Sequence, residues 1–213
     1  IAKEIKANAD IALEKIILFA RKETGYSILS EESGYIPGTN NSNKLFIIDP
    51  LDGTFNFVKG LGPCAISISL WENQKPIFGV VYDLLGQQLS WGGKNFGSYC
   101  EGKKLIVSNI TTKSKASICT GFPVRFDTSN NDAMLQLWNL VTPYAKVRMV
   151  GSAAMSILYV AKGSADMYSE KNIMLWDVAA GLAILDGAGG SFNIEKTNIE
   201  WSYNVEASNN VLR

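Results

Sequence analysis

The chain has 213 residues and a mass of 23.2 kDa, a length that can bury a sizeable core without disulfides or structural metals. Its 20 basic and 20 acidic side chains cancel to zero net charge, which argues against a nucleic-acid or anionic-membrane binder. The chain has no histidine, so Ser-His-Asp and Cys-His catalysis and histidine-ligated zinc are excluded, which leaves carboxylates, hydroxyls, lysines and oxygen-bound metals.

The first half of the chain predicts one helix and then strands. An apolar stripe that begins at Asp10, a suitable N-cap, predicts a helix to about residue 21. Short apolar runs and strict alternation predict four strands, at residues 26–29, 45–48, 65–71 and 76–82. We expect the second of these strands to end at Asp49-Pro50, because proline cannot donate to a strand ladder.

The second half mixes short strands with three helices. Strands are predicted at residues 89–91, before a Gly92-Gly93 turn, and at 105–107, and helices at 131–144, 151–161 and 178–185, the last with Asp177 as its cap. The five tryptophans, Trp138 among them, are expected in the core. Helices and antiparallel strands in a non-alternating order predict an α+β fold, with residues 1–213 as a single domain.

The segment Asp49-Pro50-Leu51-Asp52-Gly53-Thr54 has the strongest chemical signal. Two carboxylates three residues apart follow a buried strand, and Pro50 restricts the backbone between them, so both can converge on one point. The Leu51 carbonyl can add an oxygen ligand, and backbone amides that start a helix after Gly53 suit a phosphate oxygen. The pattern therefore indicates a Mg²⁺–phosphate site, although two consecutive surface turns would also explain it.

Two other acidic positions are unremarkable when each is considered alone. Two adjacent acids such as Glu31-Glu32 are usually solvent-exposed surface residues, and Asp177 is typical of an ordinary helix N-cap. Their joint occurrence with the Asp49/Asp52 turn, in this order, favours a functional cluster, which we expect to be exposed. Because the carboxylates would repel one another without metal, metal binding is also expected to stabilise the fold.

Three segments resemble the signatures of the inositol monophosphatase family. They are Ser30-Glu31-Glu32-Ser33, the run from Ile48 to Phe57 and Trp176-Asp177-Val178-Ala179-Ala180-Gly181. The resemblance extends from about Asp10 to Asn209. It implies a layered, alternating helix and sheet sandwich of the inositol monophosphatase and sugar bisphosphatase type, and Mg²⁺-dependent, lithium-sensitive phosphomonoesterase activity.

The resemblance also implies roles for individual residues. Metal binding, by two or three Mg²⁺ ions, is assigned to Glu31, Asp49, Asp52, Asp177 and the Leu51 carbonyl, with Glu32 as a supporting acid. Thr54 and Asp10, with metal-bound Glu31 beside them, match the residues that activate the attacking water. Substrate binding is assigned to Gly53 and Thr54 for phosphate and to Ser152, Ala153, Glu170 and Asp177 for the alcohol.

Inositol-1-phosphate or a similar small polyol phosphate is the favoured substrate, because Asn56-Phe57 resembles the inositol-phosphate branch of the family. Fructose-1,6-bisphosphatase and 3′(2′),5′-bisphosphate nucleotidase activities are the alternatives on the same fold. A metal-binding partner protein without turnover is the non-enzyme alternative. The resemblance implies a homodimer, and three scattered cysteines without a signal sequence or membrane span predict a cytoplasmic protein.

The chain departs from the family pattern at several points. Ser30 stands where the family usually has glycine, and Ala9 stands where threonine usually precedes the acid matched to Asp10. The N-terminal helix is short and no closing helix follows Asn209, so either the chain is naturally compact or residues are absent from the given sequence.

Overall fold

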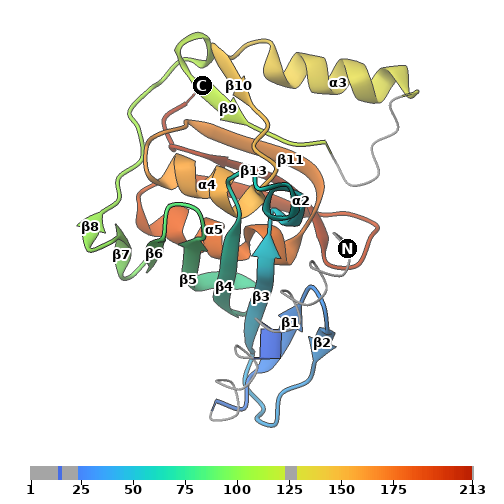
Figure 1. Cartoon of the computed structure of the whole chain (residues 1–213), viewed down its shortest axis with the longest axis vertical. Helices are drawn as coiled ribbons and strands as arrows, with labels where there is room; N and C mark the ends of the chain where they lie inside the picture. Colours follow the sequence, from blue (N-terminus) through green and yellow to red (C-terminus); the bar gives the residue numbers. More distant parts are fainter. Residues whose placement is uncertain (1–13, 16–23, 123–128, 213) are drawn as a thin grey trace.

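The computed structural model describes residues 14–15, 24–122 and 129–212. Most of the helix predicted from Asp10 lies outside these residues; the two described residues within it, Glu14 and Lys15, are helical. The described elements form two β-sheets with helices packed between and beside them (Figure 1). None of the described helices combines the length and apolarity needed to cross a bilayer.

The first sheet contains eight described strands in the order β2-β1-β3-β4-β5-β6-β7-β8. Their bounds are β1 Ser27–Ser30, β2 Gly34–Ile36, β3 Lys44–Asp52, β4 Ala65–Glu72, β5 Lys75–Asp83, β6 Gln88–Gly93, β7 Gly97–Cys100 and β8 Lys103–Lys104. All neighbouring strands are antiparallel except β1 and β3, which run parallel. Strands β4 and β5 pair antiparallel, which confirms the predicted hairpin. Alternation along β4 places one face of the strand against the core.

The sequence predicts that strand β3 ends at Asp49-Pro50. In the structure the strand continues to Asp52. Asp49 pairs with Ser67 and Asp52 with Ala65, so Pro50 and Leu51 together face one residue of β4. A β-bulge of this kind leaves a residue unpaired, which removes the need for the amide that proline lacks. The bulge brings both aspartates to the same end of the strand.

The second sheet has five described strands in the order β10-β9-β11-β13-β12. Their bounds are β9 Ser117–Cys119, β10 Lys146–Arg148, β11 Met167–Met174, β12 Ser191–Lys196 and β13 Ser202–Ser208. Strand β9 pairs in parallel with β10 and β11, whereas β13 pairs antiparallel with β11 and β12. Both sheets mix strand directions, which confirms the predicted α+β class.

Helices α4 (Ala153–Ala161) and α5 (Leu175–Gly187) lie between the two sheets (Figure 1). Both helices are rich in alanine and branched aliphatic residues; nearly every residue of α4 is buried, as are all residues of α5 from Val178 to Leu185. A helix that is apolar all round is stable only when it is covered on all sides, here by a sheet on either face. This central layer holds Asp177 near the start of α5.

Two local predictions differ from the structure. Residues 105–107 do not form a strand, because the Leu105 amide donates to Ser98 and the Val107 amide to Ala188, two separate segments. Gly92 and Gly93 belong to β6, and the turn follows them. Both errors arise because apolar runs and glycine pairs report local preference, whereas hydrogen-bond partners are set by tertiary structure.

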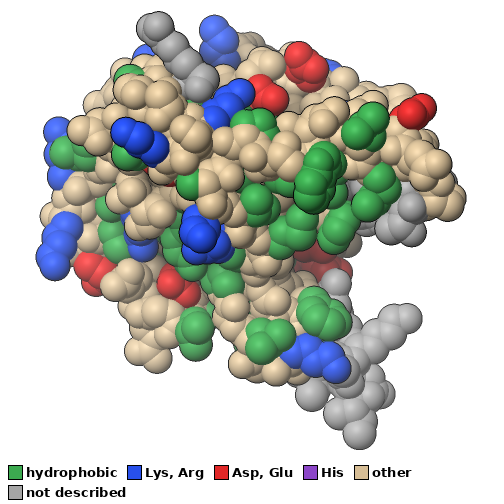
Figure 2. Space-filling model, turned by 90° about the horizontal axis from the view of Figure 1, so that it is seen from above, with side chains coloured by type: hydrophobic (Ala, Val, Ile, Leu, Met, Phe, Trp, Pro, Cys, Tyr) green, Lys and Arg blue, Asp and Glu red, His purple; other side chains and the backbone are tan. Residues whose placement is uncertain are grey.

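Helix α3 (Asn131–Val141) forms where it is predicted, with Asn130 as its cap, but buries none of its residues. The Asn130 side-chain oxygen accepts hydrogen bonds of 3.1 Å from the amides of Asp132 and Ala133. Trp138, expected in the core, is 66% exposed. Figure 2 shows hydrophobic side chains on the face of the molecule that carries this helix. The helical period identifies an apolar face but not whether another element covers it.

Candidate metal centre

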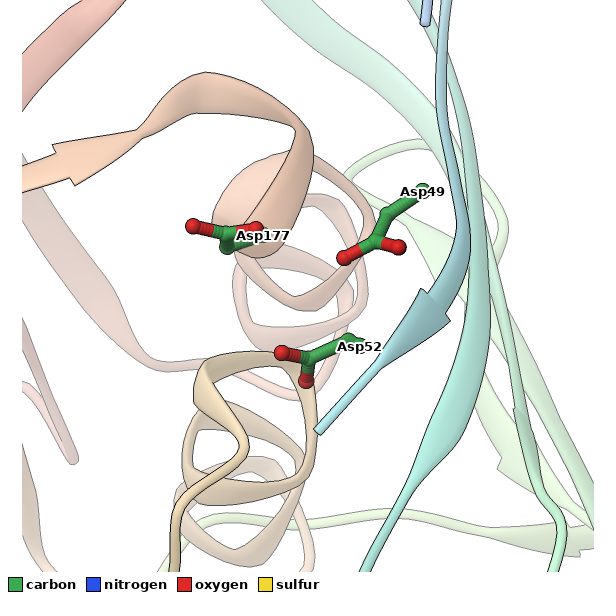
Figure 3. A group of neighbouring side chains, drawn as sticks. All are labelled: Asp49, Asp52 and Asp177. Atoms are coloured by element: carbon green, nitrogen blue, oxygen red, sulfur yellow. The ribbon is translucent and has the colours of Figure 1, made fainter. Parts of the chain in front are cut away.

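Three aspartates converge between the two sheets. Asp49 and Asp52 come from the bulged end of β3, and Asp177 comes from the first turn of α5. One carboxylate oxygen from each lies within 4.8 Å of the others. Figure 3 shows the three carboxylates pointing toward one another. The convergence predicted for the Asp49/Asp52 turn is therefore observed, although the cluster is largely buried rather than exposed.

Asp49 is 1% exposed, and only one of its two carboxylate oxygens accepts a hydrogen bond from the described residues. Its Oδ1 accepts a hydrogen bond of 2.9 Å from the Leu51 amide, whereas Oδ2 is buried and has no hydrogen-bond partner among the described residues. Burial raises the pKa of Asp49 well above its ordinary value, and the charges of Asp52, Asp177 and Glu31 raise it further. An unpartnered buried carboxylate oxygen is costly unless a proton or a cation satisfies it.

Asp52 is held by the start of α4. Its Oδ2 accepts a hydrogen bond of 2.9 Å from the Ala154 amide and another from the Ser152 hydroxyl. Burial raises the pKa of Asp52 to about 6, and the hydrogen bonds from Ser152 and from the Ala153 and Ala154 backbone offset part of that rise. These contacts fix one oxygen of Asp52 toward α4.

Asp177 occupies the third helical position of α5, so it is not the cap that its sequence predicts; Met174 is the N-cap. Its position in the first turn still places the carboxylate at the positive end of the helix dipole. Burial raises the pKa of Asp177 well above its ordinary value, with further increases from Asp52, Glu31 and Glu170. All three carboxyl groups thus pay for burial and mutual repulsion, and a divalent cation bound by oxygen ligands relieves both costs.

Glu31 and Glu32 lie in the turn between β1 and β2, beside this cluster. The Glu31 amide donates to the Ile48 carbonyl at 3.2 Å, which anchors the turn to β3 next to Asp49. The negative charge of Glu31 raises the pKa of each of the three aspartates. Glu31 is half-buried, whereas Glu32 is exposed. The structure therefore brings Glu31 near the three aspartates, with Glu32 on the solvent side of the turn.

The departure at Ser30 is accommodated by a hydrogen bond. The buried Ser30 hydroxyl donates to Glu14 Oε1 at 2.5 Å, so that the residue before Glu31 is tied to the N-terminal helix. Asp10, the predicted partner of Thr54, lies outside the described residues.

Gly53 and Thr54 begin α2 (Thr54–Lys59) directly after Asp52. Gly53 has a φ of 82°, and a Cβ at this position would lie 2.9 Å from the Pro63 carbonyl oxygen, so both conformation and space require glycine. The Thr54 hydroxyl donates to the Leu51 carbonyl at 2.9 Å. This bond uses one lone pair of the predicted carbonyl ligand and leaves the threonine oxygen available as an acceptor.

The residues predicted to contact the substrate alcohol come from two elements. Ser152 caps α4 and directs its hydroxyl proton to Asp52, with Ala153 following it. Glu170 lies on β11, and its Oε2 accepts a hydrogen bond of 3.1 Å from the Tyr168 hydroxyl. Burial raises the pKa of Glu170 to about 7; the Tyr168 hydrogen bond lowers it, and the charge of Asp52 raises it.

Sequence reasoning missed the structural role of Asn56. Its buried side-chain amide donates to the Pro63 carbonyl at 2.8 Å and to the Val150 carbonyl at 2.7 Å. It therefore links α2 to the loop that leads into Ser152 and α4. An asparagine between two phenylalanines on a short helix was the available signal, but its partners are remote in sequence.

Comparisons with known proteins identify similar sequences and structures. The model of the Inositol monophosphatase family matches residues 2–206. A Nus factor SuhB of Xylella fastidiosa is 35% identical over 187 residues, which cover 86% of this chain and 66% of that protein. Inositol monophosphatase 1 of Bos taurus is 34% identical over 224 residues, covering 96% of this chain and 79% of that protein.

A similar solved structure is that of an inositol monophosphatase from Anabaena (Nostoc) sp. PCC 7120. It superposes with a TM-score of 0.87 at 34% identity, and the match covers 96% of this chain and 82% of that one. The layered architecture implied by the sequence motifs is thus also found in a solved structure. The chain spans about two thirds of the length of the Xylella fastidiosa protein.

Proposed function

Because the chain belongs to the inositol monophosphatase family, a family of phosphatases, we propose that it hydrolyses small polyol phosphates such as inositol-1-phosphate with Mg²⁺ as cofactor. The observation that carries this proposal is the buried Oδ2 of Asp49, which lies beside the carboxylates of Asp52 and Asp177 and has no hydrogen-bond partner among the described residues. Oxygen donors held together in this way suit Mg²⁺ better than softer metals.

The proposed ligands are Asp49, Asp52, Asp177, Glu31 and the Leu51 carbonyl, shared between two or three ions. When bound, Mg²⁺ supplies the positive charge that offsets the carboxylates and the phosphate and makes water a better nucleophile. Glu32, exposed in the turn beside Glu31, is proposed as a supporting acid rather than a ligand.

Thr54 is proposed to orient the attacking water. Because its hydroxyl proton is directed to the Leu51 carbonyl, Thr54 Oγ1 can accept a hydrogen bond from the water and so fix its position. The matching carboxylate from the resemblance is Asp10, which would accept the water proton.

The substrate is proposed to lie between the start of α2 and β11. Backbone amides at Gly53 and Thr54 would hold a phosphate oxygen. Glu170, with a pKa of about 7, is partly protonated near neutrality and can therefore accept or donate a hydrogen bond to a substrate hydroxyl. Ala153 and the Ser152 backbone would form the opposite wall, while the Ser152 hydroxyl positions Asp52.

Sugar bisphosphates are the second candidate substrate class. A relative from Aquifex aeolicus named fructose-1,6-bisphosphatase/inositol-1-monophosphatase is 34% identical over 172 residues. Its double name supports keeping fructose-1,6-bisphosphate beside inositol-1-phosphate, with bisphosphate nucleotides third. A single domain over residues 1–213, a homodimer, a cytoplasmic location and lithium sensitivity remain proposals that follow from the family and the sequence alone.

The test is phosphate release from inositol-1-phosphate, fructose-1,6-bisphosphate and 3′-phosphoadenosine-5′-phosphate, with Mg²⁺ and with EDTA. We expect release only with Mg²⁺, fastest for inositol-1-phosphate, and abolished in Asp52→Asn. Preferred hydrolysis of one of the other compounds would change the assigned substrate. Mg²⁺ binding without release from any of them would contradict the proposed activity and favour a metal-binding protein without turnover.

A further inference from the structure

Apart from the metal centre, a cleft lies at the end of the sheets where β1, β3 and β4 approach the β12–β13 hairpin. It has a volume of about 720 Å³, and none of the proposed catalytic residues that the structure describes lines it. In Figure 1 the turn between β12 and β13 lies near β2, and the ring contact between Tyr35 and Trp201 joins the two segments. The cleft is therefore formed by segments far apart in the sequence.

Four of the described residues that line the cleft are aromatic. The rings of Tyr35 and Trp201 are stacked, with centroids 6.0 Å apart and an interplanar angle of 18°. Tyr35 is 52% exposed, so part of this stack faces solvent, whereas Trp71 and Tyr203 are buried at the same cleft. Exposed aromatic faces beside a buried aromatic wall favour a ligand that has a flat ring.

The cleft is positively charged although the whole chain is neutral. Its two charged lining residues among those described are Lys44 and Lys196, and no carboxylate lines it. The Lys44 ammonium lies 5.3 Å from the centroid of the Tyr26 ring, a contact that holds its position while leaving its N–H groups available to an anion. The other lining residues with polar side chains are serines, asparagines, a glutamine and tyrosines.

Three residues that line this cleft have a left-handed backbone conformation. Trp201 has a φ of 60°, in the left-handed region that a bulky residue rarely adopts, and the lining residues Asn73 and Gln74 have φ values of 50° and 62°. The Trp201 carbonyl accepts a hydrogen bond of 2.9 Å from the Leu175 amide, which fixes the strained residue to the start of α5. Glycine or asparagine usually occupies a hairpin position with such a φ, so tryptophan is unusual here. The strained residue places its indole ring beside Tyr35.

We propose that this cleft is a second binding site, separate from the metal centre, for a small molecule with a planar aromatic ring and an anionic group. The ring would stack on the Tyr35–Trp201 pair, and the anionic group would bind Lys196 and Lys44. Nucleotides and aromatic acids share this chemistry.

Naphthalene-1-sulfonate is a suitable probe, because it carries a ring and a fixed negative charge but no phosphate ester that the proposed activity could hydrolyse. Its binding to the full chain is measured by calorimetry, with 1-naphthalenemethanol as the neutral ring and methanesulfonate as the anion without a ring. Trp201→Gly is the main variant, since glycine accepts the observed φ and the variant should remain folded. Lys196→Gln tests the charge, and Asp52→Asn tests the metal centre.

We expect saturable sulfonate binding that weakens at least tenfold in Trp201→Gly and several-fold in Lys196→Gln, and that is unchanged in Asp52→Asn. Both control compounds should bind at least several-fold more weakly. Circular dichroism checks that each variant is folded. The proposal is overturned by absent binding, by equal affinity of wild type and folded Trp201→Gly, by equal affinity for the neutral ring, or by binding that disappears in Asp52→Asn. Because the readout is binding rather than phosphate release, its failure is distinguishable from failure of the proposed phosphatase activity.

Discussion

Replacing Asp52 with asparagine should stabilise the metal-free protein while removing its response to Mg²⁺. Asparagine keeps the shape of the side chain and an oxygen that can accept the hydrogen bonds from Ser152 and Ala154. It removes only the negative charge that is buried beside Asp49 and Asp177. The variant thus isolates the electrostatic cost of the cluster from its packing.

The magnitude follows from the pKa of Asp52. A rise from 3.8 to about 6 corresponds to roughly 3 kcal/mol, at about 1.4 kcal/mol per pH unit. Because the folded-state pKa is the higher one, the stabilising contribution of the protonated form is complete below about pH 4 and is lost as the pH rises through about 6. Without metal at about pH 8, Asp52→Asn should therefore be about 1–3 kcal/mol more stable than wild type, with little difference at about pH 4.

Urea unfolding with EDTA and with Mg²⁺, at both pH values, measures this difference. Mg²⁺ should stabilise the wild type at about pH 8 and have a much smaller effect on Asp52→Asn. Asp186→Asn, on the last turns of the same helix that carries Asp177, is the matched control and should respond to Mg²⁺ as the wild type does. A metal-free Asp52→Asn that is less stable than wild type at about pH 8 would refute the claim that the buried charge of Asp52 destabilises the metal-free fold.

Three further substitutions test the surroundings of the centre. Gly53→Ala should lower the free energy of unfolding by about 1–3 kcal/mol and reduce activity, because it adds a Cβ clash to an unfavourable φ. Gly60→Ala is the control: φ is 65° there but the space is open, so urea unfolding should show a smaller loss of stability. Asn56→Ala should cost about 1–3 kcal/mol by leaving two partly buried carbonyl oxygens unpaired, and an unchanged unfolding midpoint would contradict the proposed link between α2 and α4. In the metal-free protein, protonated Glu170 stabilises the fold; this contribution is complete below about pH 4.5 and disappears as the pH rises through about 7. Glu170→Gln should therefore flatten that part of the plot of unfolding free energy against pH. An unaltered plot would show that Glu170 is not the group responsible.

The sequence predicted the acidic turn well because its signal is local. Asp49 and Asp52 are two carboxylates three residues apart around a proline, and their convergence depends mainly on that short segment. The long-range assembly with Asp177 was accessible only through the resemblance to a family, since neither spacing nor periodicity relates residues more than a hundred positions apart. That Asp177 lies in the first turn of α5 rather than at its cap changes its local environment but not its proximity to the other two.

Other features depend on tertiary contacts that have no local signature. The bulge at Pro50 and Leu51 exists because β4 provides one residue opposite two, and β4 begins thirteen positions beyond Asp52. Trp138 belongs to a helix with a clear apolar face, yet no other described element buries it. Burial of the carboxylates raises their pKa values, and this burial likewise depends on how α4 and α5 pack over the end of β3.

The most direct test of the central claim is the rate of phosphate release from inositol-1-phosphate as a function of Mg²⁺ concentration, measured for wild type, Asp177→Asn and Asp186→Asn. We expect saturable Mg²⁺ activation of the wild type, the same curve for Asp186→Asn, and loss of activity at every Mg²⁺ concentration in a folded Asp177→Asn. Equal Mg²⁺-dependent rates for Asp177→Asn and wild type would contradict the central claim, because the buried cluster would then not be the metal centre of the reaction.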